Sequence, residues 1–457
     1  MAAILTSGTR IFNATQIYNS FANDNVDHMY LFVGKSTPWA DDTTPPLPVD
    51  SFYEDTNLRR DILAMKRITE TDSSLGIFRR DWKLGTYYDI YRTDYGMSGV
   101  NGVNPSDGSP TTPESYLDAN YYVVTDEYNV YICLWNNNNS ISSVKPTGTS
   151  TSSFTTADGY IWKYMYSISA ADVLKFVSSN FIPIKTLVTN PGSESPYYTQ
   201  WEVQQAAVPG TIQRFLVTNG GSGYPVSTSF PITVTGDGTG CVAIANTNIS
   251  GAVSSITITN PGIGYTWVNV SIPTGTGAVV VPLLSPRGGF GSDPVVQLGG
   301  HFTLISTSIA FDEADFPQIN DYRRIGIIKS PWNYGTTTIA NAATLSATKK
   351  LQLNLGVSGN FTLDEEITGT VSGAKGTVVS YDADTKVLTY VQVGNQTGTF
   401  QVSESVTGAG SSAIGVISAV INPEVNPNSG ELIYLEHRRP VTRQADQTEY
   451  IKITIES

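Results

Sequence analysis

The 457-residue chain is poor in charge. Charged residues make up 15% of it, against about 25% in an average globular protein. Acidic residues outnumber basic ones, 40 to 27, which gives a net charge of −13. A protein that binds nucleic acid needs clustered Lys and Arg to displace counterions from phosphates. The basic pairs here, such as Arg59-Arg60 and Arg323-Arg324, are isolated. The sequence therefore predicts no nucleic-acid partner, and local ion pairs with neighbouring acids such as Asp61.

Cysteine and histidine are scarce, with two and three residues. Cys133 and Cys241 lie far apart in the sequence, which argues against a disulfide framework and predicts two reduced thiols. His28, His301 and His437 form no spaced ligand pair, and no Gly-x-Ser-x-Gly motif accompanies them, so we predict neither a zinc site nor a serine triad. Apolar runs are short as well. None approaches the ~18 residues of a membrane span, and the N-terminal run is too short for a signal peptide, so we predict no membrane partner.

Glycine-rich turns and acidic runs are the remaining candidates for a cofactor or catalytic site. A phosphate loop needs a strand, glycines and then a helix, but Pro38 follows Gly34-Lys35-Ser36 where that helix should begin. The acidic runs 312–315 and 364–366 lack the spacing of a calcium loop, and we expect both to be solvated turns. The sequence thus predicts no catalytic residue, no cofactor and no metal. A glycan hydrolase that uses two distant carboxylates remains an alternative, because such a pair needs no sequence motif.

The chain does contain enough β-forming and apolar sequence for several cores. Its length predicts two to four compact units, and 40% of its residues are hydrophobic. Alternating aromatic and β-branched residues favour strands. The expected strands are 30–33, a hairpin over 121–135 and an aromatic strand over 158–166. Expected helices cover 10–21, 52–67 and 170–177.

The helix over 52–67 carries the clearest signals. Ser51 and Glu54 have the spacing of a capping box, and Leu58, Ile62 and Met65 recur at helical spacing. The fold class predicted from these patterns is mainly β and multidomain, a β-rich scaffold with a few short helices and two inserted small all-β repeat modules.

Two internal repeats define those modules. Residues 217–224 resemble 258–265 at an offset of 41, and 238–242 resemble 275–279 at an offset of 37. A second repeat, at an offset of 39, pairs residues of the same type: Phe361, Glu365, Thr368, Gly369, Ala374 and Gly376 with Phe400, Glu404, Thr407, Gly408, Ala413 and Gly415. Each repeat predicts a duplicated β unit, inserted where added length costs little closure entropy. The predicted domains are scaffold segments 1–204, 287–347 and 423–457, with the inserted Gly-Tyr module at 205–286 and a second duplicated module at 348–422.

A proline-rich arm and several aromatic and basic residues are candidates for partner contacts. The prolines of segment 44–50 predict an extended arm, which loses little entropy when it docks on a neighbour. Large rings such as Trp39 and Trp82 are interface anchors if they are exposed, although a core role is equally compatible with the sequence. The candidate interface residues are Trp39, Pro45, Pro46, Pro48, Arg79, Arg80, Trp82, Arg438 and Arg439.

The C-terminal stretch from Ser429 to Glu449 reads as two short strands joined by an Arg/Pro turn at Arg438-Arg439-Pro440. Together with four earlier segments, in this order, it resembles the baseplate wedge subunit of T-even-like contractile-tailed bacteriophages. The earlier segments are 17–20, 32–39 with 45–51, 79–82 and 158–164. The resemblance covers residues 1–204, 287–347 and 423–457 and leaves both repeat modules outside it.

The resemblance implies a structural virion protein without catalytic activity or cofactor. It implies an elongated homodimer that binds other baseplate wedge proteins in the tail baseplate, after assembly in the host cytoplasm. We expect the inserted modules to contact a tail fibre or a peripheral tail protein. The alternative is a tail fibre or receptor-binding protein that holds glycans, which would be a trimer rather than a dimer.

Overall fold

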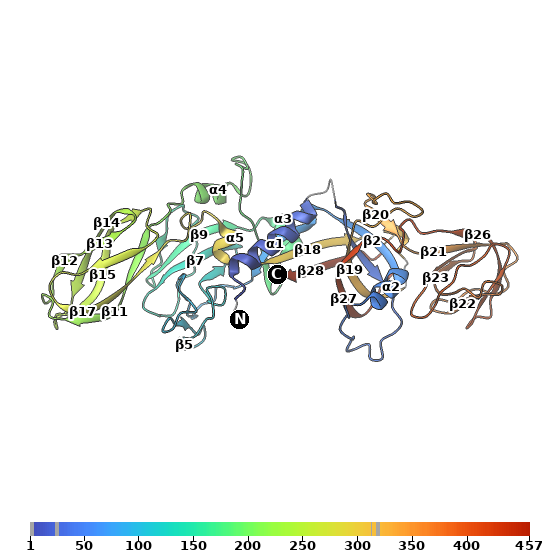
Figure 1. Cartoon of the computed structure of the whole chain (residues 1–457), viewed down its shortest axis with the longest axis horizontal. Coiled ribbons are helices and arrows are strands. Elements are labelled where there is room, and N and C mark those ends of the chain that lie inside the picture. Colours follow the sequence, from blue (N-terminus) through green and yellow to red (C-terminus); the bar gives the residue numbers. More distant parts are fainter. Residues whose placement is uncertain (1–3, 23–26, 312, 317–319) are drawn as a thin grey trace. The chain divides into compact units, whose positions relative to one another are not determined.

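The computed structural model describes residues 4–22, 27–311, 313–316 and 320–457. Strands dominate these residues, which also form five α-helices and two short 3-10 helices (Figure 1). The prediction of a mainly β protein with a few short helices is confirmed. Within the described residues, the helices are all too short or too polar to cross a membrane.

The chain forms two compact units, each assembled from segments that are distant in the sequence. The first unit comprises residues 1–15, 74–304 and 455–457, and the second comprises residues 16–73 and 305–454. Each unit contains one of the two segments with internal repeats. The boundary between the units falls inside four elements: α1 (Ser7–Ala22), β3 (Ser73–Phe78), β18 (Phe302–Ile309) and β28 (Glu449–Glu456).

Small sheets and short helices make up the first unit outside its repeat. Its further elements are β4 (Gly102–Val103), β5 (Pro110–Thr111), β6 (Tyr122–Val124), β7 (Asn129–Asn136), β8 (Phe154–Thr155), β9 (Tyr160–Ser167), α3 (Ala170–Phe176), β10 (Phe181–Ile184), α4 (Tyr198–Gln205) and α5 (Pro294–Leu298). The antiparallel sheet β6-β7-β9-β8 contains the predicted hairpin and the predicted aromatic strand. Helix α3 also forms as predicted, because Ser169 caps it by accepting a hydrogen bond from the Asp172 amide at 3.1 Å.

Aromatic rings form the core beside this sheet. Tyr160, Trp162 and Tyr164 alternate along β9 and therefore point to one face of the sheet. All three are almost fully buried, as is Tyr131 of the neighbouring strand. The rings of Tyr160 and Trp162 are stacked with centroids 5.5 Å apart, within the favourable range for aromatic pairs.

The second unit is built on a five-stranded antiparallel sheet with the order β20-β2-β1-β19-β27. Its elements outside the repeat are β1 (Met29–Gly34), α2 (Phe52–Asp61), β2 (Ile62–Ile68), η1 (Glu70–Asp72), η2 (Glu313–Asp315), β19 (Asp321–Lys329), β20 (Thr344–Ser346) and β27 (Glu431–Thr442). Strand β1 lies between β2 and β19, and all six of its residues are buried. Its continuous apolar run is typical of a strand that is covered on both faces.

The helix predicted over 52–67 is wrong in its second half. It begins as expected, because Ser51 accepts a hydrogen bond from the Glu54 amide at 3.2 Å, but α2 ends at Asp61. From Ile62 the chain is extended and pairs with β1 as strand β2. Residues 62–68 are rich in β-branched and apolar side chains, and pairing in a buried sheet outweighs the local helical spacing.

The predicted Arg/Pro turn is also wrong. Residues 438–440 lie inside β27, and the turn falls at 443–448, before β28. Strand β27 is at the edge of the sheet, and its pairing with β19 shifts register opposite these residues, between Tyr322 and Arg324. An irregular edge strand tolerates Pro440, whose missing N–H removes no ladder bond there.

The Gly-Tyr repeat of the first unit folds into seven short strands. They are β11 (Ile212–Ser222), β12 (Ser229–Pro231), β13 (Thr233–Gly236), β14 (Thr239–Thr247), β15 (Val253–Ile263), β16 (Val268–Ser271) and β17 (Thr276–Leu284). They form the sheets β11-β17, β12-β14-β15 and β13-β16. The repeated tyrosines, Tyr224 and Tyr265, are both buried in the core of this module. A Cβ atom on Gly275 or Gly238 would lie within 2.5 Å of their rings, which explains why glycine stands at both positions.

The repeat of the second unit folds into a closed six-stranded barrel with the order β21-β24-β23-β22-β25-β26 (Figure 1). Its strands are β21 (Lys349–Leu353), β22 (Glu366–Gly369), β23 (Lys375–Asp382), β24 (Val387–Val391), β25 (Ser405–Gly408) and β26 (Ile414–Ile421). Thr368 pairs with Thr407, and Lys350 pairs with Thr389. Each of these pairs joins a residue to its own counterpart 39 positions further on. The two copies are therefore related by a local two-fold axis that passes through both pairings.

Two buried glutamates hold the copies of the barrel together. Glu365 accepts hydrogen bonds from the amides of Gly410 and Ser411, at 3.0 and 2.8 Å. Its counterpart Glu404 accepts from Val371 and Ser372, at 2.9 and 2.8 Å. We call this reciprocal arrangement the glutamate clasp.

The expectation that both acidic runs are solvated turns is thus wrong for Glu365, which is 8% exposed. In the other run, Glu313 and Asp315 pair with Lys66 and Lys350, at 2.5 and 2.8 Å. Asp312 lies outside the described residues.

Candidate interface residues and pockets

Trp39 is half-buried, and its contacts fix it within the second unit. Its ring packs against the imidazole of His437, with centroids 4.6 Å apart. Its Nε1–H donates a hydrogen bond to the Arg438 carbonyl at 2.8 Å. The Arg438 side chain in turn binds Glu436 with two hydrogen bonds, at 2.8 and 3.1 Å. These contacts fix Trp39 against strand β27, and the local ion pair expected for Arg438 is present.

The proline-rich arm contacts the same part of strand β27. His437 Nδ1 donates to the carbonyl of Pro46 at 2.9 Å, which ties the middle of the arm to β27. Pro45 and Pro48 are half-buried, whereas Pro46 is exposed. Residues 45–50 form neither helix nor strand, as expected for an extended arm. The structure therefore brings Trp39, the arm and Arg438 together, while the Arg439 side chain is exposed nearby in the sequence.

A buried charge cluster supports the base of the arm. The guanidinium of Arg324 binds the carboxylates of both Asp61 and Glu54, the latter at 2.5 Å. Glu54 also lies 3.5 Å from His437 Nε2. We call Trp39, Glu54, Asp61, Arg324 and His437 the arm anchor. Sequence reasoning missed it and paired Asp61 with its neighbours Arg59 and Arg60, but Arg59 binds Asp55 instead, at 2.9 Å.

Burial dominates the electrostatics of the arm anchor. It raises the pKa of Asp61 to about 8, against the opposing effect of Arg324. Burial also lowers the pKa of His437, which favours the neutral imidazole. A neutral imidazole can donate through Nδ1 to Pro46 and leave Nε2 facing Glu54. The anchor therefore holds the arm through specific hydrogen bonds and packing.

The arm and the first turn of α2, which follows it, expose several large apolar side chains to solvent. Leu47 is 88% exposed, Val49 64%, Phe52 93% and Tyr53 69%. We call these four residues the arm ridge. Single exposed apolar residues are common on protein surfaces, but several within seven positions form a patch of the kind that marks interaction sites.

The three candidates in the first unit have partners within it. Arg79 forms an ion pair with Asp81 at 2.8 Å, a local pair of the kind predicted for the basic pairs of this chain. Arg80 donates to the Leu117 carbonyl at 2.8 Å and lies 4.6 Å from the centre of the Tyr122 ring. Trp82 is half-buried against the aromatic core, and its Nε1–H lies 3.1 Å from Ser142 Oγ. These contacts give all three a structural role in holding segment 79–82.

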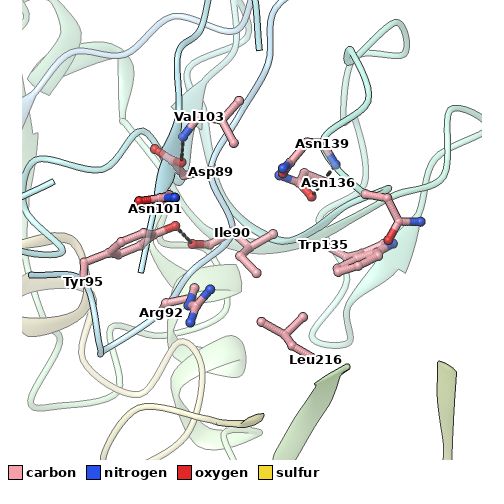
Figure 2. A pocket seen from close by; sticks show the side chains of 11 residues that line it. Asp89, Ile90, Arg92, Tyr95, Asn101, Val103, Trp135, Asn136, Asn139 and Leu216 are labelled. Atoms are coloured by element: carbon pink, nitrogen blue, oxygen red, sulfur yellow. Dashed lines mark hydrogen bonds between the residues drawn. The ribbon is translucent and has the colours of Figure 1, made fainter. Parts of the chain in front are cut away.

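A polar pocket of about 280 Å³ lies in the first unit, between segment 89–103 and the end of β7. Tyr95 and Arg92 come from one wall, and Trp135 and Asn139 from the other (Figure 2). Asp89 at its base accepts hydrogen bonds from the amides of Val103 and Asn120, at 2.7 and 2.6 Å (Figure 2 draws the first).

The charged groups of this pocket have partners inside the chain. Besides the two amides on Asp89, Arg92 binds Asp94 through two hydrogen bonds of 2.8 Å. Burial raises the pKa of Asp89, against the opposing effect of the two amides. These contacts stabilise the loops around the pocket.

The histidines and cysteines have individual surroundings. His28 and His301 each contact a main-chain carbonyl through Nδ1, at 2.5 and 2.7 Å. Cys133 is buried, Cys241 is half-buried, and both are free thiols, as predicted. In the described part of the chain, no three His, Cys, Asp or Glu side chains are grouped so that they could hold a metal ion. In comparisons with known proteins, the sequence matches no protein-family model and no curated protein.

Proposed function

We propose that this protein is a structural component of the baseplate wedge of a contractile phage tail. It acts as a homodimer that holds neighbouring wedge proteins together through protein–protein contacts, and it is not an enzyme. The sequence resemblance over three scaffold segments suggests this class. The arm ridge is the observation that carries the proposal, because it exposes four large apolar side chains on a segment that is already fixed in place.

The physical basis is a preorganised docking element. The prolines restrict φ along the arm, and the hydrogen bonds from His437 to Pro46 and from Trp39 to Arg438 fix its base. Binding therefore orders few additional groups, so more of the apolar burial contributes to affinity. Phe52 and Tyr53 supply the large rings that dominate interface energetics, and we propose a second copy of the chain as their first partner.

Light scattering after size exclusion tests this proposal on the full-length chain. We expect the wild type to have twice the chain mass of 49.3 kDa. A variant with Leu47→Ser, Phe52→Ser and Tyr53→Ser should shift towards the single-chain mass, because these exposed residues contribute to association and little to folding. Leu355→Ser, at a site that is 89% exposed in the barrel, is the matched control and should leave the mass unchanged.

The same measurement separates the rival functions. A wild-type mass of three chains would favour the trimeric fibre or receptor-binding class. A single-chain mass at every concentration, or a dimer that the triple substitution leaves intact, would overturn the proposed role of the arm. Release of sugar products from host polysaccharide by the purified chain would favour the hydrolase instead.

A further inference from the structure

The two copies of the Gly-Tyr module differ by one strand. Nine positions separate Tyr224 from Thr233, where β13 begins, but three positions separate Tyr265 from Val268, where β16 begins. The longer connection of the first copy contains β12, which pairs with β14 through Ser229↔Asn246, Phe230↔Ala245 and Pro231↔Ile244. The second copy is six residues too short to form such a strand.

The missing strand leaves one edge of β17 uncovered. Its counterpart β14 lies between β12 and β15, whereas β17 is in a two-stranded sheet with β11. In the described part of the chain, no strand pairs with the other edge of β17. In the first copy, β12 pairs with Ala245 of β14, and the Ile232 amide bonds to the carbonyl of Ala243.

The counterparts of these two alanines, 37 positions further on, are Val280 and Pro282. Both line a pocket of about 400 Å³. The pocket therefore lies where the first copy places its own additional strand.

The walls of this pocket are suited to main-chain recognition. Residues 268–272 line one side, residues 275–278 with Val280 and Pro282 line the other, and Tyr224 also contributes. All twelve lining residues are uncharged. Long stretches of two strands thus flank a neutral slot, which is the setting in which an extended peptide adds a strand to a sheet edge.

We propose that this slot binds a short, extended and uncharged peptide segment of another protein, which supplies the strand that the second copy lacks. The first copy provides the template. There, the Ile232 amide donates to the Ala243 carbonyl at 3.1 Å, and the Thr247 amide donates to the Thr228 carbonyl at 3.0 Å. The counterparts of Ala243 and Thr247 are Val280 and Leu284, which keep the same main-chain groups. Phe230 stacks on Tyr224 in the first copy, with centroids 6.4 Å apart. The counterpart of Tyr224 is Tyr265, which does not line the slot, so the template sets the main-chain bonds and not the side chain at this position.

Pro282 makes the slot selective without closing it. A proline on an uncovered edge removes one N–H and hinders indiscriminate strand pairing. The two template bonds use the counterparts of residues on either side of it, Val280 and Leu284. A segment with β12-like spacing therefore retains both bonds, although its residue at the position of Phe230 faces the missing N–H, because Phe230 pairs with Ala245 in the first copy.

A synthetic peptide tests the slot directly. The probe is a capped peptide with the sequence of residues 227–233, Ser-Thr-Ser-Phe-Pro-Ile-Thr, added to the full-length protein. We expect saturable binding and slower hydrogen exchange at residues 280–284. Ser271→Trp, at an exposed position in the wall of the slot, should weaken binding about tenfold or more. Val242→Trp, on an exposed position of β14 outside the slot, should leave binding unchanged.

A graft provides a second measurement that needs no added ligand. Replacing Thr266-Trp267 with a copy of residues 225–232 restores the length of the first copy. The graft should slow hydrogen exchange at residues 280–284 and abolish peptide binding. Unchanged or faster exchange in the graft, no binding to the wild type, or equal binding to the Ser271→Trp variant would each overturn the proposal. No other tail protein takes part, so failure here is distinct from failure of the self-association test above.

Discussion

Both repeat modules contain two copies of one β unit, but one module forms a closed barrel and the other keeps an open sheet edge. In the barrel, one offset of 39 relates the two copies, every strand has a counterpart, and the edges close on each other. In the Gly-Tyr module the offset between the copies is 41 at the tyrosines and 35 between β13 and β16. It then rises to 37 between β14 and β17. One strand is missing, and one edge stays open. A constant offset therefore goes with two complete copies, whereas a change in the offset marks the place where one copy lacks a strand.

We expect the largest effect from substitutions in the glutamate clasp, which test whether the two copies of the barrel are equivalent. Glu365→Ala removes the acceptor for the amides of Thr362, Gly410 and Ser411. Because buried donors without partners are costly, we expect a loss of about 2–3 kcal/mol in the local stability of the barrel. Glu404→Ala should cost the same amount. Hydrogen exchange of β22 and β25, followed by mass spectrometry, measures both.

Glu366→Ala is the matched control for the clasp. Glu366 forms a half-exposed ion pair with Lys375 at 2.6 Å, and such surface pairs contribute about 1 kcal/mol or less. Clearly unequal effects of the Glu365 and Glu404 substitutions would contradict the two-fold equivalence of the copies.

Glycine-to-alanine substitutions sharpen the contrast in the Gly-Tyr module. A Cβ on Gly238 would lie 2.5 Å from the Tyr265 ring and 2.6 Å from the Ile263 carbonyl, so the backbone must move. A Cβ on Gly275 would meet the Tyr224 ring, which also borders the open slot and has room to shift. At Gly275 the φ of +36° adds backbone strain for alanine, which offsets the room around Tyr224. Overpacking costs about 1–3 kcal/mol, and we expect both Gly238→Ala and Gly275→Ala to destabilise the module by an amount in this range. Hydrogen exchange at β14 and β17, followed by mass spectrometry, measures both, and a loss well below 1 kcal/mol for either variant would contradict the close packing of these glycines against the repeated tyrosines.

Acidification should weaken the clasp. Burial raises the pKa of Glu365 and of Glu404, but the hydrogen bonds from the facing serine and amides outweigh it, so both pKa values are lowered. A lowered folded-state pKa stabilises the barrel above the unfolded value of about 4.3, and this stabilisation is lost as the pH falls through the folded pKa. Carboxyl NMR titration of the full chain should give a lowered pKa for both glutamates. Ordinary or raised values would mean that the clasp does not favour the ionised carboxylates.

We expect the smallest loss of barrel stability from substitution of the two serines that face the clasp. Ser372→Ala and Ser411→Ala each remove a hydroxyl that donates to the opposite glutamate at 2.7 Å. The amide bonds to the same carboxylates remain, so each substitution should cost about 1 kcal/mol. Exchange rates at β22 and β25 again provide the readout, and a change in one half of the barrel without the other would contradict the reciprocal arrangement.

Local signals were the part of this structure that could be predicted. The cap at Ser51, the helix that begins at Ala170 and the hairpin of β6 and β7 are encoded within short windows of sequence, and both repeats are visible from sequence identity alone. The end of α2 was missed because Ile62–Ile68 is drawn into a buried sheet, a tertiary effect that its helical spacing conceals. The Arg/Pro segment was misplaced because the edge position of β27, which tolerates Pro440, depends on the order of strands.

The candidate interface also has one part that the sequence predicts and one part that depends on tertiary structure. The proline arm follows from composition, since prolines set its conformation wherever it lies. The arm anchor does not, because Asp61 and Arg324 are 263 positions apart and only folding brings them together. The exposure of the arm ridge likewise depends on which residues α2 and β27 cover.

The central claim is that the exterior of this chain is built for assembly. For the proposed function, the strongest measurement is quantitative mass spectrometry of complete contractile-tail particles purified from the source of this gene. We expect the chain to be present in these particles and to remain with the baseplate fraction after the tails are dissociated. Complete particles that lack the chain would contradict the proposed function.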